Sequence, residues 1–227
     1  MPRRFIAERR RDPYYRAAQR EGLRSRAAFK LAYLADRFPI FRSGDRVLDL
    51  GAAPGGWSLV ARERVGRSGE VVGLDVRSMD PIPGVKAERG RVGDPTLAER
   101  WPTGRFDVVL SDMAPSISGA YATDHARSVS LVRAALALAE HVLADGGVFV
   151  AKFFDGDLRA ELDAEGSPRF DRWTHSKPPA SRQSSSEIYA IGLGFRPPEG
   201  TARRAASEPK GAPSEGPDGG GHSSPVG

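Results

Sequence analysis

Short runs of branched apolar residues alternate with amphipathic stretches along the middle of the chain. The apolar runs are bounded by turn residues and predict strands, whereas apolar positions at helical spacing predict helices. The predicted strands are Arg46–Leu50, Glu70–Asp75, Val85–Arg89, Phe106–Ser111, Gly147–Phe153, Phe170–His175 and Glu187–Leu193. The predicted helices are Ser25–Phe38, Gly56–Val65, Pro95–Trp101, His125–Leu143 and a weaker one at Asp157–Asp163.

This alternation predicts a Rossmann-like α/β domain with a mostly parallel seven-stranded sheet. Strands that are apolar throughout and separated by helices are typical of a parallel sheet with helices on both faces. The short connection Lys177–Ser186 leaves no room for a crossover helix, so we expect the last two strands to be antiparallel. Ligands of such sheets bind at the carboxyl ends of the strands.

The two ends of the chain differ from this middle part, residues 25–196. Residues 1–24 form a basic arm, and residues 1–26 hold nine arginines against three acidic residues, although the net charge of all 227 residues is only +5. Arginines neutralise phosphates, so the arm indicates a nucleic acid partner, with a solvated tail as the alternative. Residues 197–227 are rich in Pro, Gly and Ser, and we expect them to be disordered.

Composition restricts the environment of the protein. The chain has no cysteine, which excludes disulfides and thiolate metal sites, and we expect no bound metal. No apolar run reaches the roughly 18 residues of a membrane span, and no apolar stretch follows the basic N-terminus as in a secretory signal. We therefore expect a cytoplasmic protein without membrane contact, and a monomer, because no oligomerisation segment is evident.

A glycine-rich loop, Gly51–Trp57, follows the first strand directly and predicts a cofactor site. Its glycines allow a tight turn and a close approach of ligand to backbone. Pro54 lacks an N–H that a pyrophosphate would use, and Asp49 places a carboxylate before the loop. S-adenosylmethionine, with its amino-acid moiety and sulfonium, fits these features better than a dinucleotide. Asp75 ends the second strand, where a carboxylate can accept the hydroxyls of a ribose.

Two charged residues interrupt apolar strands and predict a reactive centre. Asp112 follows the fourth strand and Lys152 lies in the fifth, where a lone buried charge is costly. The two residues lie on neighbouring strands, so each is expected to pair with the other. A structural ion pair without chemistry is the alternative to a catalytic role.

Six segments of the chain resemble the FtsJ/RrmJ family of ribosomal RNA 2′-O-methyltransferases over residues 11–195. They are GLRSRAAFKL (Gly22–Leu31), LDLGAAPGGWS (Leu48–Ser58), MDPIPGV (Met79–Val85), LSDMAPSISG (Leu110–Gly119), AKFFDG (Ala151–Gly156) and SKPPASRQSSSEIYAIGLGF (Ser176–Phe195). The resemblance implies a class I S-adenosylmethionine-dependent methyltransferase. Its expected substrate is a ribose 2′-hydroxyl, of a uridine in 23S ribosomal RNA of the large subunit.

The resemblance also implies the site residues. The catalytic tetrad would be Lys30, Asp112, Lys152 and Glu187. The cofactor contacts would be Gly55, Trp57, Asp75 and Asp112, together with Asp49 and Gly51 of the loop argument. Lys152 would either take the proton of the hydroxyl or stabilise the alkoxide, with Lys30 and Glu187 orienting lysine and ribose.

The sequence departs from the family pattern at three places. Gly90-Arg91 replaces a Gly-Asp pair in the adenine-binding segment, and Asp94 could either meet adenine or cap the following helix. Ser116 stands in place of an Asn, and Ser186 in place of an Arg. Three other functions remain open at this stage: a tRNA 2′-O-methyltransferase, a non-catalytic RNA-binding ribosome-assembly factor and a small-molecule methyltransferase.

Overall fold

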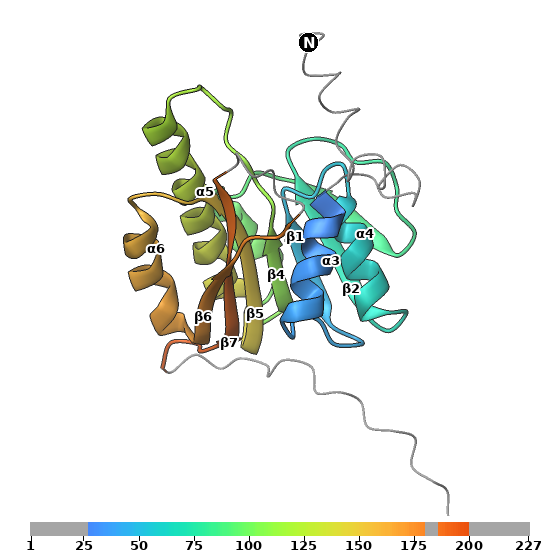
Figure 1. Ribbon diagram of the computed structural model, residues 1–227. Helices are drawn as coiled ribbons and strands as arrows, with labels where there is room; N and C mark the ends of the chain where they lie inside the picture. Colours follow the sequence, from blue (N-terminus) through green and yellow to red (C-terminus); the bar gives the residue numbers. More distant parts are fainter. Residues whose placement is uncertain (1–26, 180–185, 200–227) are drawn as a thin grey trace, which may run out of the picture.

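The chain forms a seven-stranded, mostly parallel sheet with the strand order β3-β2-β1-β4-β5-β7-β6 (Figure 1). The computed structural model describes residues 27–179 and 186–199. The strands are β1 (Arg46–Leu50), β2 (Glu70–Asp75), β3 (Val85–Arg89), β4 (Phe106–Ser111), β5 (Leu143–Phe154), β6 (Phe170–Ser176) and β7 (Glu187–Phe195). Strand β7 is antiparallel to β6, as predicted, and also to β5, and the fold class is confirmed.

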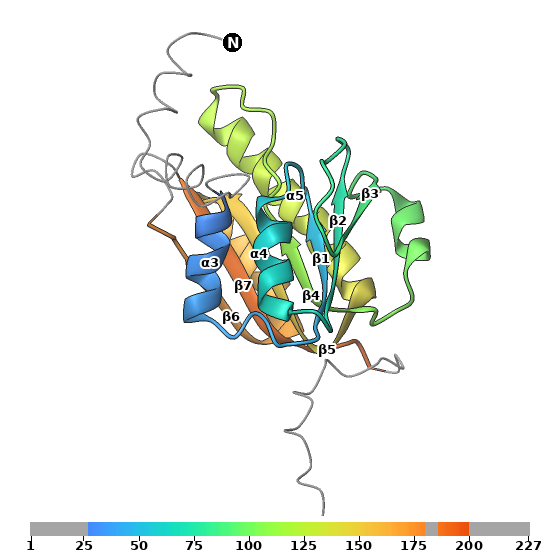
Figure 2. The same cartoon turned by 90° about the vertical axis from the view of Figure 1, so that its right-hand side faces the viewer.

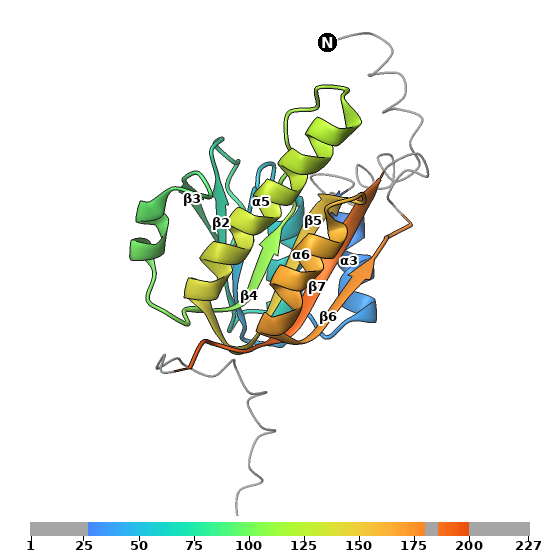
Figure 3. The same ribbon diagram turned by 90° about the vertical axis from the view of Figure 1, so that its left-hand side faces the viewer.

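Helices cover both faces of this sheet. They are α3 (Ala27–Arg37), α4 (Gly56–Val65), α5 (Tyr121–Val142) and α6 (Arg159–Gly166), with short 3-10 turns η1 (Pro95–Arg100) and η2 (Ser167–Arg169). Helices α3 and α4 lie on one face (Figure 2) and α5 and α6 on the other (Figure 3). None of these helices is long and apolar enough to cross a membrane, within the ranges described.

The apolar core forms two layers, one on each face of the sheet, because successive side chains of a strand point to opposite faces. In β4, Val108 packs with the residues of α3 and α4, whereas Val109 packs with those of α5. Val47 and Leu48 of β1 divide in the same way. Successive side chains of a strand point to opposite faces, so a strand that is buried on both sides is apolar throughout.

One element type and several element boundaries, including both ends of α6, differ from the predictions. The stretch after Asp94 is a 3-10 turn and not an α-helix, and the Asp94 side chain caps it by accepting from the backbone N of Thr96 at 2.9 Å. Helix α5 begins at Tyr121, four residues before the predicted start. Strand β5 begins at Leu143, which pairs with Phe106 before a register shift in β4, and not at Gly147.

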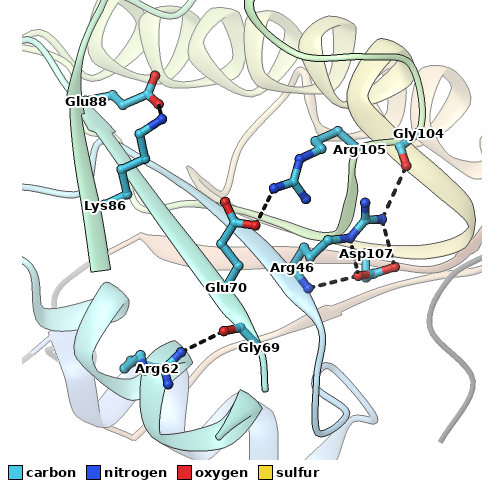
Figure 4. Close-up of polar contacts among 9 residues, drawn as sticks. All are labelled: Arg46, Arg62, Gly69, Glu70, Lys86, Glu88, Gly104, Arg105 and Asp107. Atoms are coloured by element: carbon cyan, nitrogen blue, oxygen red, sulfur yellow. Dashed lines mark hydrogen bonds and ion pairs between the residues drawn. The ribbon is translucent and has the colours of Figure 1, made fainter. Parts of the chain in front are cut away.

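Charged residues form ion pairs at the end of the sheet where the parallel strands begin, opposite their carboxyl ends (Figure 4). Arg46 of β1 donates its backbone N–H and its guanidinium to Asp107 of β4 at 2.8 and 3.1 Å. Arg105 pairs with Glu70 of β2. Burial raises the pKa of nearby Asp45 to about 6, and the charge of Asp107 adds to this effect. This cluster joins three strands and lies away from the predicted site.

Candidate active site

A cavity of about 450 Å³ lies at the carboxyl ends of β1, β2 and β4. Four predicted cofactor residues line it: Gly51, Trp57, Asp75 and Asp112. Gly51 has a φ of +75°, and a Cβ there would lie 2.6 Å from the Cγ of Met113. Only glycine therefore allows the loop to pass this close to β4. The cavity has the size of a pocket for a cofactor-sized ligand.

Asp49 lies beneath this cavity and does not line it. Its side chain is fully buried in β1, and Oδ2 accepts from the hydroxyl of Ser58 at 2.6 Å. Oδ1 has no hydrogen-bond partner among the residues that the structure describes. Burial raises the pKa of Asp49 to about 7, and the charges of Asp112 and Asp75 act in the same direction. Asp49 is thus a buried carboxyl group supporting the floor of the cavity.

The predicted contact Gly55 also lies outside the lining of the cavity. It has a φ of +103° and immediately precedes α4 as its N-cap residue. Its backbone N–H donates to the carbonyl of Ala52 at 2.6 Å, which closes the turn of the loop. Gly55 therefore shapes the loop whose neighbours reach the cavity.

Asp75 is held by the loop and by Arg77. It accepts from the backbone N of Ala53 at 3.0 Å, from the backbone N of Arg77 at 2.8 Å and from the Arg77 guanidinium at 3.3 Å. Burial alone would raise the pKa of Asp75, but these hydrogen bonds outweigh it and the pKa is lowered. Arg77 was not predicted from the sequence. Its guanidinium binds the Asp75 carboxylate, which was predicted to accept the hydroxyls of a ribose.

The segment after β3 also contributes to the cavity, and it places an arginine there. Gly90, Arg91 and Val92 line the cavity, next to Val76. Asp94 is engaged with Thr96 as a cap, so of the two roles weighed for Asp94 the structure shows the cap. These hydrogen bonds lower the pKa of Asp94. A ligand placed here would meet Gly90, Val92 and the charged side chain of Arg91.

The four residues of the predicted tetrad come from four separate segments of the chain and form two ion pairs. The Nζ of Lys152 on β5 lies 3.0 Å from Oδ1 of Asp112 and donates to the Asp112 carbonyl at 2.9 Å. The Nζ of Lys30 on α3 lies 2.7 Å from Oε2 of Glu187 on β7. Both lysines are buried, where an unpaired charge is costly, and each has an acidic partner that compensates this cost.

Tyr189 connects the two ion pairs. Its hydroxyl donates to Oδ1 of Asp112 at 3.2 Å, and the Nζ of Lys30 lies 5.9 Å from the centre of its ring. The ring also packs against Trp57, with 5.6 Å between ring centres. Tyr189 was not predicted from the sequence. The available signal was its position two residues after Glu187, which places both side chains on one face of β7.

Asp112 belongs to both parts of the site. Its side chain lines the cavity and also pairs with Lys152, so a ligand in the cavity would lie next to the lysine. The Nζ of Lys152 directs two N–H groups at Asp112. Within residues 27–179 and 186–199 these are its polar contacts, so one tetrahedral position on this nitrogen is left for a third group.

Comparison with known proteins shows the family to which the chain belongs. Residues 23–195 match the FtsJ-like methyltransferase family. The chain belongs to this family. The resemblance inferred from the sequence motifs is thereby confirmed, and so is the expectation that the protein is a methyltransferase.

Relatives of this FtsJ-like methyltransferase are named ribosomal RNA large subunit methyltransferase E. One from Gluconobacter oxydans is 46% identical over 197 residues, which cover 86% of this chain and 73% of the relative. Another from Methanothermobacter thermautotrophicus is 43% identical over 86% of this chain and 95% of its own. The crystal structure of a ribosomal RNA methyltransferase from Plasmodium falciparum superposes with a TM-score of 0.69 and 29% identity, covering 76% of this chain and 98% of that one.

Proposed function

We propose that the protein transfers a methyl group from S-adenosylmethionine to the 2′-hydroxyl of a uridine ribose in 23S ribosomal RNA of the large subunit. The observation that carries this proposal is the pair of Lys152 and Asp112 at the wall of the cavity, because it sets a basic nitrogen beside the cofactor position. The names of the relatives support the substrate. Such a substrate would place the reaction in the cytoplasm, and we propose a monomer.

The cavity fits S-adenosylmethionine in size and in the chemistry of its lining. Gly51 and Trp57 would hold the cofactor from the loop, with Gly55 shaping the turn. Asp75 would accept the ribose hydroxyls, and Asp112 would face the cationic sulfur. Asp49 supports this arrangement from below, because its carboxyl group lies beside the loop. When bound, S-adenosylmethionine supplies an electrophilic methyl group.

Lys152 would act on the proton of the attacking hydroxyl. Two N–H groups of its Nζ are directed at Asp112, which fixes the direction of the remaining position. In the neutral amine that position is a lone pair that takes the hydroxyl proton, and in the ammonium form it is an N–H that stabilises the alkoxide. Lys30 and Glu187 would orient the ribose, and Tyr189 holds their pair against Asp112.

Replacement of Lys152 by Ala tests the proposal. We expect methyl transfer to large subunits, isolated from cells that lack the gene, to fall by about 100-fold or more, because a positioned acid–base group contributes that much. Mass mapping of ribose methylation in 23S RNA is the measurement. Lys86→Ala is the matched control, since Lys86 pairs with Glu88 on the surface of β3. Full activity of Lys152→Ala, or labelling of tRNA in place of 23S RNA, would contradict the proposal.

A further inference from the structure

The amino-terminal end of α5 and the loop before it present apolar side chains to solvent. Within residues 27–179 and 186–199, three large apolar side chains are exposed: Val76, Ile117 and Tyr121. Ile117 is 65% exposed and Tyr121 is 59% exposed. This end of α5 projects beyond the carboxyl ends of the strands (Figure 3). An exposed aromatic ring has no stabilising role in the core, so another reason for its position is needed.

The ring of Tyr121 is fixed by polar contacts and by stacking. Its hydroxyl donates to the carbonyl of Asp155 at 2.7 Å, and its ring lies parallel to that of His125, with 6.1 Å between centres and 9° between planes. His125 is itself fixed, because its Nδ1 donates to the carbonyl of Phe154 at 2.8 Å and its Nε2 accepts from the backbone N of Leu158 at 3.0 Å. Tyr121 thus has little conformational freedom left to lose on binding a partner.

The loop that precedes Tyr121 is also held in place. Asp124 of α5 accepts from the backbone N and the hydroxyl of Ser118, both at 2.8 Å, and from the backbone N of Gly119 at 3.0 Å. These hydrogen bonds lower the pKa of Asp124. Arg127 donates to the carbonyl of Ser116 at the surface, which adds a positive charge beside the loop. The loop before the exposed ring is therefore preorganised, and it carries Arg127 at the surface.

Tyr121 is tied to the strand end that carries the candidate catalytic groups. Its acceptor Asp155 follows Lys152 by three residues on the same chain segment. The neighbouring Phe154 pairs with Glu187 across β5 and β7. The hydroxyl of Tyr121 thus lies against the chain segment that continues directly from Lys152.

We propose that Tyr121 is a stacking platform for a nucleobase adjacent to the methylated ribose. This inference rests on the proposed function, since it needs RNA as substrate. A fixed, exposed aromatic ring can stack on the flat face of a base, and the arginine on the preceding loop can meet a phosphate, which is how proteins hold unpaired RNA bases. A protein partner would need a larger apolar surface than the exposed side chains of Ile117 and Tyr121 offer.

Three substitutions separate stacking from the other roles of the side chain. Tyr121→Phe keeps the aromatic ring and loses the hydroxyl, Tyr121→Leu keeps apolar bulk without a π-face, and Tyr121→Ala loses both. We expect the KM for large subunits to rise by about five-fold or more in the Leu and Ala variants, and to change by less than about two-fold in the Phe variant. All three variants lose the hydrogen bond to Asp155, so any change in kcat at saturating subunits should be common to them, and the dissociation constant of S-adenosylmethionine should stay at the wild-type value.

A second measurement does not depend on catalysis. Ultraviolet crosslinking of the wild-type protein on large subunits, followed by trypsin digestion, is expected to give a nucleotide adduct at Tyr121 within the peptide 106–127. Equal KM values for all variants, a Phe variant as impaired as the Ala variant, or a crosslink from Tyr121 to a ribosomal protein would overturn the inference. If wild-type protein methylates no 23S RNA, the proposed function fails instead, and the adduct still reports on Tyr121.

Discussion

At the scale of single residues, burial of Asp49 disfavours the ionised form of its carboxyl group. The carboxyl group lies inside β1 with one hydrogen bond, from Ser58, and its pKa rises from the ordinary value of 3.8 to about 7. A raised pKa means that the folded protein binds a proton more tightly than the unfolded chain does. This residue therefore destabilises the fold once it ionises, which a role beside the cofactor loop would explain.

Asp49→Asn should flatten the dependence of stability on pH. In the wild type, the free energy of unfolding should fall as pH rises from about 4 to about 7, by roughly a few kcal/mol, because the folded state holds the proton over that range. The Asn variant can still accept the hydroxyl of Ser58 and has no proton to lose. Urea titrations across this pH range give the two slopes. Asp45, whose pKa is about 6, contributes equally to both proteins. Equal slopes would show that Asp49 does not titrate in this way.

Arg77→Ala should tighten the binding of S-adenosylmethionine. The guanidinium, 67% exposed, competes for the carboxylate of Asp75 and repels a cationic cofactor. Surface ion pairs of this kind contribute up to about 1 kcal/mol, so we expect a dissociation constant lower by up to about five-fold. Isothermal titration calorimetry measures it. Arg67→Ala removes the same charge from an exposed position before β2 and should bind like the wild type. Weaker binding in Arg77→Ala would mean that Arg77 is itself a cofactor contact.

The pairing of Lys152 with Asp112 could be predicted from the sequence, but two neighbouring side chains of the site could not. Lys152 and Asp112 were expected to pair, because neither charge could be buried alone on adjacent strands, and the structure confirms this pair. Tyr189 and Arg77 were missed, because a tyrosine in a strand and an arginine in a turn have ordinary structural explanations. Their importance arises from which side chains they meet, and that depends on packing across distant segments.

At the scale of elements, the first turns of α5 hold the end of β5 through three side chains. Tyr121 and His125 donate to the carbonyls of Asp155 and Phe154, and Ser128 accepts from the backbone N of Phe154 at 3.1 Å. A helix brings residues at this spacing onto one face. The helix therefore fixes the chain directly after Lys152.

His125→Ala should loosen this connection. It removes two hydrogen bonds to the backbone and should lower the free energy of unfolding by about 1–3 kcal/mol, because Leu158 loses a partner in a half-buried position. Ser130→Ala is a matched control, since the hydroxyl of Ser130 donates to the carbonyl of Ala126 in its own helix at the surface. Hydrogen exchange at the amide of Leu158 should be faster in His125→Ala and unchanged in the control. Equal exchange rates would assign the connection to Tyr121 and Ser128 alone.

Element boundaries could be predicted wherever burial produced a clear pattern. The ranges of β1 to β4 and of α4 are those expected. Strands β1, β2 and β4 are buried between turn residues, whereas the edge strand β3 is largely exposed. The first turn of α5 was missed, because it projects beyond the sheet and needs no apolar face. Its start depends instead on Asp124, which accepts hydrogen bonds from the preceding loop. The early start of β5 was missed because Gly146 and Gly147 look like a turn.

At the scale of the whole molecule, positive charge is concentrated at one end of the chain. Nine arginines lie within residues 1–26, and the remaining residues carry slightly more acidic than basic groups. The predicted arm (residues 1–24) lies outside the described residues, as does the predicted tail beyond residue 199. Both therefore stay predictions. The described domain supplies the cavity and the tetrad, so the arm is the part of the chain best suited to general attraction of RNA.

Neutralising the arm should weaken RNA binding without affecting the cofactor site. In the full-length protein, Gln would replace five arginines: Arg3, Arg4, Arg9, Arg10 and Arg11. Because each lost phosphate contact releases fewer counterions, the slope of log affinity against log salt should become shallower by about 0.7–0.9 per contact. Filter binding of large subunits at several salt concentrations measures the slope, and calorimetry should show unchanged S-adenosylmethionine binding. Replacing Arg203, Arg204 and Lys210 of the tail by Gln is the control, for which we expect the wild-type slope. An arm variant with the wild-type slope would instead make the arm a solvated tail and leave RNA binding to the domain itself.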